Sequence, residues 1–308
     1  MVVLIVEPID PEVMQWLVAR HPVRFAPDLA RDPQAFRKAL RQVRALVIPA
    51  NVALDAETLA LAPELRAVGR LSAGIENIDF EACARAGVEV VRPVDSTAQA
   101  EAEYMIGALL QMLRRVPVVN AEGLLVGREL CGATVGLVGM APAARPLAAL
   151  LEAFGSRVLG YDPMLHASDS RWNDWGIAPV SLRELMELSD GACVMLSYFT
   201  RYQHLLGERY LPFCRPNQVL VSISPSNIFD DRALADVLAT GRMAAAWFDC
   251  MEPGQLDVGR PLAARDNLQV TPRVASTTRE SRVRAAWDVA QRLDALLTQL
   301  QRGPLGAK

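Results

Sequence analysis

The sequence predicts an α/β fold with two doubly wound parallel-sheet domains. Short apolar, β-branched runs alternate with helical patterns along most of the 308 residues, and this alternation is typical of βαβ units. Ten such runs are many for one sheet, so two sheets are expected. The chain is 51% hydrophobic and 22% charged, which is enough apolar sequence to build two buried cores.

Each expected strand is a short apolar run bounded by turn residues or by a helical pattern. The ten predicted strands are residues 2–6, 45–49, 67–71, 88–91, 134–138, 157–161, 192–197, 218–223, 244–248 and 268–271. Helical patterns lie between them, with the clearest at residues 142–154, 181–186 and 231–240.

Two further helices predict how the domains are connected. Residues 101–115 form a helical pattern between two sets of strands and are the best candidate for a connector. The last helical pattern, residues 280–300, is expected to fold back onto the first domain. The predicted domains are therefore residues 1–98 with 276–308, and residues 99–275.

Composition and charge exclude several classes of function. The net charge of −3 and the pI near 5.8 argue against nucleic acid or an anionic membrane as the main partner. No apolar run is long enough to span a bilayer, and the first ten residues are interpreted as a strand, so a cytoplasmic protein is expected. The five cysteines and three histidines form no CxxC motif or Cys/His cluster, so no metal site is predicted.

Residues 132–163, GATVGLVGMAPAARPLAALLEAFGSRVLGYDP, predict a dinucleotide-binding unit. The order is strand, tight turn, helix, second strand and then an acid, Asp162. The N-terminus of the helix offers N–H groups and a positive dipole end to a pyrophosphate. A carboxylate after the second strand accepts ribose hydroxyls and disfavours a 2′-phosphate, so NAD is preferred over NADP.

The glycine-rich turn of this unit departs from the usual G-x-G-x-x-G pattern. Gly139 keeps the first glycine, Ala141 stands at the second, and the turn continues through Pro142 and Ala143. The methyl group of Ala141 lies where the backbone should approach phosphate, and Pro142 lacks an N–H donor. Two interpretations stay open: a working dinucleotide site, or a βαβ unit that keeps its fold without a nucleotide.

The whole chain resembles the D-isomer-specific 2-hydroxyacid dehydrogenase family. Residues 68–91, VGRLSAGIENIDFEACARAGVEVV, are similar to its substrate-domain signature, and residues 102–115, AEYMIGALLQMLRR, to its interdomain helix. Residues 230–234, 241–249 and 267–272 follow later family landmarks in the same order. The resemblance implies a flavodoxin-like substrate domain made from both chain ends, an inserted Rossmann-type NAD domain and a homodimer.

The family's catalytic arginine, glutamate and histidine are not found at the matching positions. Those positions hold Pro225, Gly254 and Arg273. An imidazole exchanges a proton near pH 7, whereas an arginine stays charged, so Arg273 cannot replace histidine in that role. The catalytic residues of this chain therefore remain unassigned from sequence.

Several binding positions of the family survive. The resemblance assigns the backbone of Ala73 and Gly74 to a substrate carboxylate, and Asp249 to the carboxamide of the nicotinamide. Asp249 is equally interpretable as a cap at a strand end. Arg273 is interpreted either as an anion-binding side chain or as part of a surface ion pair. Turn and N-cap roles are favoured for Asn77 and Asp79 over substrate contact.

Three hypotheses follow for the function. The first is a repurposed enzyme that acts on a small anionic molecule, with NAD, Arg273 and the Ala73–Gly74 amides. The second is a catalytically silent regulatory or partner protein that binds NAD or a metabolite. The third is an ordinary NAD-dependent 2-hydroxyacid dehydrogenase whose catalytic residues lie elsewhere in the chain.

Overall fold

Two units, each with its own parallel sheet, make up the structure. The computed structural model describes residues 3–72, 77–93, 95–197, 199–263 and 265–302. Unit 1 consists of Met1–Thr97 and Thr278–Lys308, and unit 2 of Ala98–Thr277. The expected mixed α/β fold with parallel sheets is confirmed. In the part of the chain that is described, no helix combines the length and the apolar character needed to cross a membrane.

The sheet of unit 1 has five parallel strands in the order β2-β1-β3-β4-β5, which is the flavodoxin-like order. Four of these strands match predicted ones. The edge strand β2 was not predicted, because its three residues are only partly buried and carry a charged residue in the middle. The five strands are β1 (Val3–Ile5), β2 (Val23–Phe25), β3 (Ala45–Val47), β4 (Ala67–Gly69) and β5 (Glu89–Val91).

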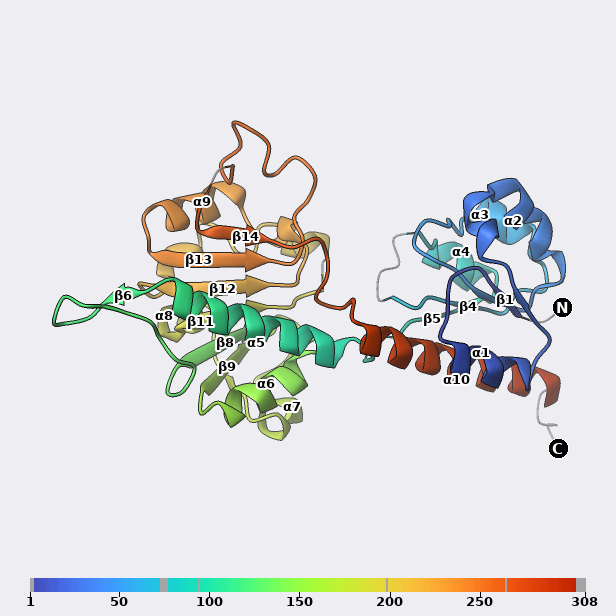
Figure 1. The fold of residues 1–308 in the computed structure, drawn as a ribbon, viewed down its shortest axis with the longest axis horizontal. Helices are drawn as coiled ribbons and strands as arrows, with labels where there is room; N and C mark the ends of the chain where they lie inside the picture. Colours follow the sequence, from blue (N-terminus) through green and yellow to red (C-terminus); the bar gives the residue numbers. More distant parts are fainter. Residues whose placement is uncertain (1–2, 73–76, 94, 198, 264, 303–308) are drawn as a thin grey trace. The chain divides into compact units, whose positions relative to one another are not determined.

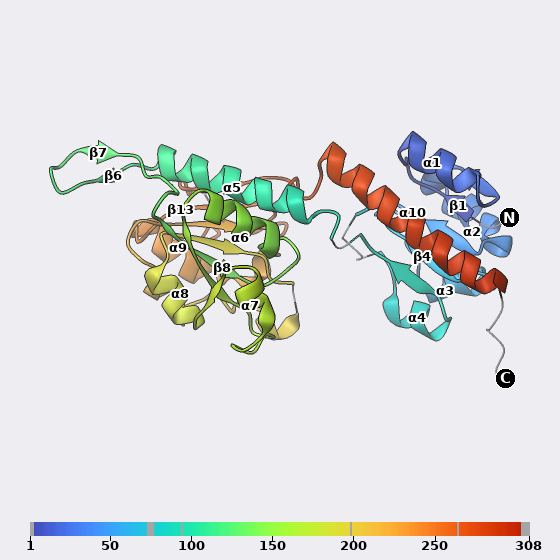
Figure 2. The same cartoon turned by 90° about the horizontal axis from the view of Figure 1, so that it is seen from below.

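Helices cover both faces of this sheet (Figures 1 and 2). One face packs on α1 (Pro11–Val18) and α10 (Arg279–Arg302). The other face packs on α2 (Pro33–Ala39), α3 (Ala56–Ala60) and α4 (Phe80–Arg85). A Cβ atom on Gly69 would lie 2.5 Å from the Val289 side chain, so a glycine there lets α10 pack closely against β4.

Aspartate side chains start the first four helices of unit 1. Each accepts hydrogen bonds from backbone N–H groups of the first helical turn, which a helix cannot satisfy internally. The capping residues of α1 to α4 are Asp10, Asp32, Asp55 and Asp79. The prediction that Asp79 works as an N-cap is confirmed, with its Oδ1 accepting the N–H of Ala82 at 2.9 Å.

The sheet of unit 2 has seven parallel strands in the order β10-β9-β8-β11-β12-β13-β14. The first of these strands in the sequence, β8, lies in the interior of the sheet, and the strand order reverses between β8 and β11. This is the Rossmann arrangement, and ligands of such sheets bind outside the carboxyl ends of the strands at the reversal point. The seven strands are β8 (Thr134–Val138), β9 (Arg157–Tyr161), β10 (Ala178–Pro179), β11 (Gly191–Val194), β12 (Gln218–Ser222), β13 (Met243–Phe248) and β14 (Leu268–Val270).

Alternating side chains of this sheet feed two separate cores. Val135 and Leu137 of β8 face a core with helices α5 (Ala98–Arg115), α6 (Ala144–Ala153) and α7 (Ser170–Asp174). Val138 faces the core of α8 (Leu182–Leu188) and α9 (Asp231–Ala239). Between α5 and β8 the chain forms an antiparallel hairpin of β6 (Val118–Val119) and β7 (Leu125–Val126), two strands that are not among the ten predicted ones.

Candidate functional site

The turn after β8 lies at the reversal point of the unit 2 sheet. Gly139 adopts φ +101°, a backbone conformation that glycine tolerates and other residues avoid. A Cβ atom there would lie 2.8 Å from the Leu196 nitrogen and 2.9 Å from the Met195 carbonyl carbon. These contacts are to backbone that follows β11, so the close approach of the two strand ends requires glycine.

The N-terminus of α6 supplies fewer donors than a standard dinucleotide turn. Pro142 and Pro146 carry no N–H, and the N–H of Ala144 donates to the Ala141 carbonyl at 2.8 Å. The N–H groups of Ala143 and Arg145 have no backbone acceptor in the part of the chain that the structure describes. Ala143 is fully buried whereas Arg145 is exposed, so the Arg145 N–H and the positive end of the helix dipole are what the turn offers a pyrophosphate, which is less than an intact motif would offer.

The alanine at the second glycine position causes no backbone strain. Among the described residues, the non-glycine positions with positive φ are His204, Asn217 and Arg273, and Ala141 is not one of them. Ala141 is half-buried, so its methyl group partly faces solvent. The backbone at this position is therefore one that alanine adopts readily.

Asp162 lies after β9 and holds the turn in place. Its Oδ2 accepts the N–H of Met140 at 2.7 Å, and its Oδ1 accepts the N–H of Met164 at 2.8 Å. Each carboxylate oxygen keeps a second lone pair, so Asp162 retains acceptors for ribose hydroxyls. The residues around this turn thus fit the adenosine half of NAD, and the ribose-binding role of Asp162 stays a prediction.

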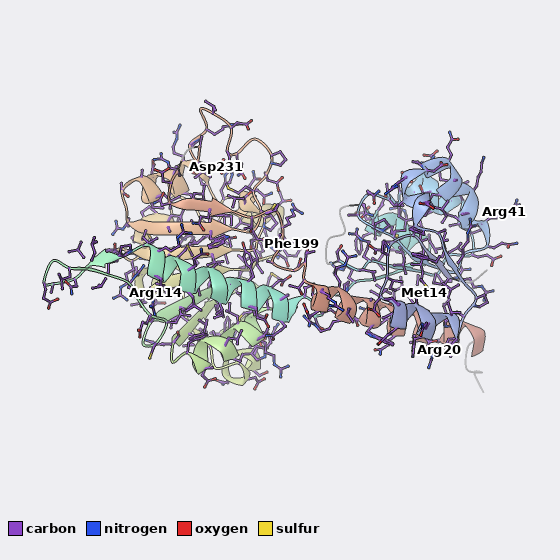
Figure 3. The ribbon with its side chains drawn as sticks, viewed as in Figure 1. Met14, Arg20, Arg41, Arg114, Phe199 and Asp231 are labelled. Carbon is purple, nitrogen blue, oxygen red and sulfur yellow. The ribbon has the colours of Figure 1, made fainter. Side chains whose placement is uncertain are left out.

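A cluster of Arg201 with aromatic side chains contacts Met164, two residues after Asp162, and the sequence analysis did not identify it. The Nη2 of Arg201 donates to the Sδ of Met164 at 2.7 Å and to the Tyr202 hydroxyl at 3.1 Å. The guanidinium also lies 5.1 Å from the ring centroid of Phe199, which is half-exposed and labelled in Figure 3. These contacts connect the loop after β9 with the loop after β11, and only the Arg–aromatic spacing could have indicated them.

Asp249, at the carboxyl end of β13, is a buried carboxylate with three hydrogen-bond donors. Its Oδ1 accepts the Thr271 hydroxyl and the Val274 N–H, both at 2.8 Å, and its Oδ2 accepts the Ala275 N–H at 2.9 Å. The Tyr104 hydroxyl lies 2.5 Å from the Thr271 hydroxyl, whose single proton is used on Asp249, so Tyr104 is the donor. Burial raises the pKa of Tyr104 to about 12, which keeps that donor protonated. The carboxylate thereby anchors the segment from Thr271 to Ala275.

Arg273 lies in the segment that Asp249 anchors. It adopts φ +56°, and its N–H donates to the Asp249 carbonyl at 2.7 Å. Its exposed side chain donates from Nε to the Cys250 sulfur at 2.9 Å. The guanidinium thus extends from a backbone that is held by hydrogen bonds on both sides of it.

The other two family positions of catalysis lie in segments joined by Gln255. Pro225 precedes the short helix Ser226–Ile228, and Gly254 adopts φ +84° in a turn, a conformation that a glutamate would adopt only under strain. The Gln255 Oε1 accepts the Ser226 hydroxyl at 2.5 Å, and its Nε2 donates to Asp231 at 2.9 Å. Gln255 therefore joins the loop after β12 to the loop after β13, and sequence reasoning missed this residue.

In unit 1, the loops after β3 and β4 are held together by a buried arginine and an asparagine. Arg70 is 2% exposed and donates to the Asn77 side chain and, at 2.7 Å, to the Ser72 hydroxyl. The Asn77 amide in turn donates to the Pro49 carbonyl at 3.1 Å. The turn role predicted for Asn77 is confirmed. The predicted substrate residues Ala73 and Gly74 lie outside the described residues.

Glu7, directly after β1, lies at the same edge of the unit 1 sheet. Its Oε1 accepts the N–H of Leu71 at 3.2 Å. Burial raises the pKa of Glu7, and the attraction of Arg70 and Arg282 offsets only part of this effect. Glu7 is thus a carboxyl group whose ionisation is opposed by the folded state.

Replacing Glu7 with glutamine is expected to stabilise the protein at neutral pH. When the pKa of a carboxyl group is higher in the folded state, its ionisation lowers the free energy of unfolding. This loss develops as the pH rises from the unfolded-state pKa of about 4.3 through the folded-state pKa. Glutamine keeps the acceptor for the Leu71 N–H and removes this cost. Thermal denaturation at pH 8 and pH 4 measures the effect, and Tm should rise at pH 8 alone.

The matched control is Glu89→Gln, which removes a carboxylate at an exposed strand position of the same unit. Its Tm should stay close to that of the wild type at both pH values. A Glu7→Gln variant with an unchanged or lower Tm at pH 8 would show that the ionised carboxylate is not unfavourable in the folded state.

The described residues contain no group of three or more His, Cys, Asp or Glu side chains that is arranged to hold a metal ion. Cys83, Cys193 and Cys214 are buried, and burial raises the pKa of each of these thiols. Their surroundings are apolar, which is typical of cysteines that serve packing.

Comparison with known proteins agrees with this geometry. The profile of the family domain described as "D-isomer specific 2-hydroxyacid dehydrogenase, NAD binding domain" matches residues 106–275. The chain is 31% identical to (S)-sulfolactate dehydrogenase of Chromohalobacter salexigens over 294 residues, covering 92% of this chain and 94% of that protein. It is 30% identical to D-3-phosphoglycerate dehydrogenase of Mycobacterium tuberculosis over 298 residues, covering 94% of this chain. The chain spans only 56% of that longer relative.

Solved structures show the same fold. The crystal structure of the apo form of D-mandelate dehydrogenase from Rhodotorula graminis superposes with a TM-score of 0.80, and the match covers 95% of this chain and 93% of that one. The sequence identity is 18%, so this likeness supports the fold alone.

Proposed function

The chain belongs to the D-isomer-specific 2-hydroxyacid dehydrogenase family and carries its NAD-binding domain, and from this premise we propose that it is a repurposed NAD-linked enzyme. Its proposed substrate is a small anionic acid. Its acid–base groups differ from the arginine, glutamate and histidine of the family. The observation that carries the proposal is the turn at Gly139, held by Asp162, in a chain whose positions matched to the family's catalytic residues hold Pro225, Gly254 and Arg273.

The NAD side of the proposal rests on the turn after β8. Asp162 receives the ribose hydroxyls, and the exposed N–H of Arg145 at the start of α6 receives the pyrophosphate, while the buried Ala143 shapes the turn. NAD supplies a hydride donor or acceptor when bound. Gly139, Ala141 and Pro142 shape the turn without donating to the phosphates in this assignment. Asp249 acts through the segment it anchors, because its carboxylate already accepts three hydrogen bonds.

The substrate side rests on Arg273 and on the relatives. Arginine grips a carboxylate through paired N–H donors, and Arg273 extends from a segment that the buried Asp249 anchors. The relatives named above act on sulfolactate and on 3-phosphoglycerate, which are small acids. Following the family pattern, we also propose a substrate-binding role for the Ala73–Gly74 backbone.

A homodimer is part of the proposal. The hairpin of β6 and β7 exposes Val119, Leu124 and Leu125, with exposed fractions of 65%, 61% and 71%. Apolar side chains that are gathered on a projecting hairpin (Figure 1) favour burial against another protein surface. A second copy of the chain is the partner that the family resemblance implies.

Titration with NADH tests the function, and Asp162→Ala is expected to weaken NADH binding at least about tenfold. The loss of two backbone contacts and of the ribose acceptors accounts for this magnitude. Without the carboxylate, the preference for NADH over NADPH should also disappear, because nothing then repels the 2′-phosphate. Fluorescence of bound NADH and NADPH measures both effects.

The control for this variant is Asp169→Ala, in the connection that follows Asp162. Asp169 binds Arg171 at 2.8 Å, and this arginine lowers the pKa of Asp169 to about 2. Its loss should leave NADH affinity unchanged. Equal NADH affinity in the Asp162→Ala variant and the wild type would overturn the cofactor assignment.

Turnover separates the enzyme from a silent homologue. A panel of small 2-oxo acids with NADH, followed at the nicotinamide absorbance, should contain at least one substrate. Tight NADH binding without turnover of any member, in either direction, would favour the regulatory or partner hypothesis.

A further inference from the structure

Unit 1 contains cavities that the proposed function does not use. One of them, of about 350 Å³, is lined by Leu71, Arg279 and Arg282, and the attraction between Arg282 and Glu7 already balances part of its charge. Another, of about 160 Å³, lies on the opposite face of the sheet, between α2 and α3. The polar side chains of this α2–α3 cavity keep unused hydrogen-bonding capacity, so it is the better candidate for a binding site.

The α2–α3 cavity lies where the strand order of the unit 1 sheet reverses. Strand β1 lies between β2 and β3 and pairs with both of them. The cavity is lined by residues of the segment 29–37, which follows β2, and of the segment 51–58, which follows β3. Sheets with this flavodoxin-like order bind ligands outside the carboxyl ends of their strands at the reversal point. The position of the cavity is therefore one at which such sheets receive ligands.

Apolar side chains form the floor of the α2–α3 cavity. Phe36 and Val52 are 3% and 6% exposed, and both belong to the core between the sheet and its helices α2, α3 and α4. Leu29 packs against the same core and completes the floor. The cavity is smaller than the pockets of about 300–1,000 Å³ that hold drug-sized ligands, so it fits a small molecule with a short apolar group.

Arg37 supplies a positive charge to the lining. Its Nη2 donates to the Glu57 carboxylate at 3.1 Å, and its Nε and Nη1 have no acceptor among the residues that the structure describes. The Glu57 side chain is 74% exposed, and ion pairs in such surroundings are weak. Arg37 can therefore bind a carboxylate through donors that the described part of the protein leaves unused.

Acceptors for a cationic group belong to the same lining. The Asp55 Oδ1 accepts the Thr58 N–H at 2.8 Å, and the carboxylate keeps further lone pairs. Hydrogen bonds from Thr58, and to a smaller degree the charge of Arg37, lower the pKa of Asp55, so this carboxyl group is ionised at neutral pH. The Asn51 Nδ2 donates to the Ala30 carbonyl at 3.1 Å, and its Oδ1 accepts no hydrogen bond from the described residues. An ammonium group can donate to both side chains.

We propose that the α2–α3 cavity binds a free α-amino acid with a short apolar side chain. The ligand carboxylate binds Arg37, the ammonium group binds Asp55 and Asn51, and the side chain lies on the apolar floor. A zwitterion matches a lining that carries one cation and one anion, whereas a simple anion would face Asp55 and a simple cation would face Arg37. The lining residues are separate from those proposed to bind NAD and substrate, so this inference does not depend on the proposed reaction.

Calorimetry with both enantiomers of alanine, valine and leucine tests the inference. At least one of them should bind the wild-type protein with a Kd below about 1 mM. Two analogues of that amino acid each lack one charge, and for valine they are valinamide and 3-methylbutanoate. Each analogue should bind about tenfold to a hundredfold more weakly, the range for hydrogen bonds between charged groups. If no amino acid binds, or if the analogues bind as tightly as the amino acid, the proposal is wrong.

Two variants assign the charged ends of the ligand. Arg37→Gln should weaken binding of the amino acid about tenfold or more and leave the affinity for the amide unchanged, because the amide has no carboxylate. Asp55→Asn should weaken binding of the amino acid and leave the affinity for the deaminated acid unchanged. Asparagine also serves as an N-cap, so α3 should keep its first turn in this variant.

Lys38→Gln is the matched control for Arg37→Gln. Lys38 is exposed, follows Arg37 and does not line the cavity, so its loss changes net charge alone. It should keep the wild-type affinity, and equal losses in the two variants would show that net charge controls binding. Ala53 lines the cavity and is exposed, so Ala53→Leu should fill the space and abolish binding without lowering Tm. Unchanged binding in Ala53→Leu would place the amino acid elsewhere.

Discussion

Replacing Asp249 with alanine is expected to lower the stability of unit 2 by about 3 kcal/mol or more. The substitution leaves the Val274 and Ala275 N–H groups and the Thr271 hydroxyl without their acceptor, and the Ala275 backbone is buried. Hydrogen bonds to a charged acceptor contribute about 1.5–3 kcal/mol each, and buried donors without acceptors cost more than exposed ones. For a domain of this size, Tm should fall by about 6–12 °C.

Hydrogen exchange locates the effect within the chain. The amide protons of Val274 and Ala275 are protected by the Asp249 carboxylate, so their exchange should accelerate far more than that of the strands. The control is Asp266→Ala, an exposed carboxylate in the same β13–β14 connection, which should change stability by less than about 0.5 kcal/mol. Unchanged exchange at Val274 and Ala275 would show that Asp249 does not anchor the segment.

Replacing Gly139 with alanine is expected to destabilise the protein by about 3 kcal/mol and to abolish measurable NADH binding. A non-glycine residue at this φ costs about 1–3 kcal/mol in backbone strain alone. The new Cβ would also lie 2.8–2.9 Å from backbone atoms of Met195 and Leu196, which cannot move without separating the ends of β8 and β11. The turn that we propose to receive the dinucleotide lies at this point, so stability and NADH affinity should fall together.

Gly132→Ala is the matched control for this prediction. Gly132 also has positive φ, +75°, but a Cβ atom there would meet nothing within 4 Å. This variant should lose about 1 kcal/mol through backbone strain and keep the wild-type affinity for NADH. Equal losses of NADH affinity in the two variants would mean that general destabilisation, and not the geometry of the turn, controls binding.

Much of the fold follows from patterns within short segments. The ten apolar runs correspond to strands of the two sheets, because strands that are buried on both faces need continuous apolar sequence. The missed strands β2 and β10 are short and lie at sheet edges, where partly exposed residues carry no such pattern. The hairpin of β6 and β7 was missed for the same reason, since its two strands have two residues each.

The candidate site also contains some features that the sequence predicts and others that it does not. The position of Asp162 after β9 was predictable, because a strand, turn, helix and strand in sequence bring that acid to the turn. The Gln255–Ser226 bond and the Arg201–Met164 contact join segments that are 29 and 37 residues apart. Neither pair belongs to a local pattern, so no short-range signal identified them.

The sequence by itself determined the order of strands and helices and the place of the dinucleotide turn. Backbone periodicity and turn chemistry are local, so they can be read from neighbouring residues. Only the tertiary structure decided that the Asp249 carboxylate accepts hydrogen bonds from Thr271, Val274 and Ala275. It also decided that Arg279 and Arg282 line the same cavity as Leu71. Such partners meet because the loops after parallel strands gather at one edge of a sheet, and that edge exists only once the sheet has formed.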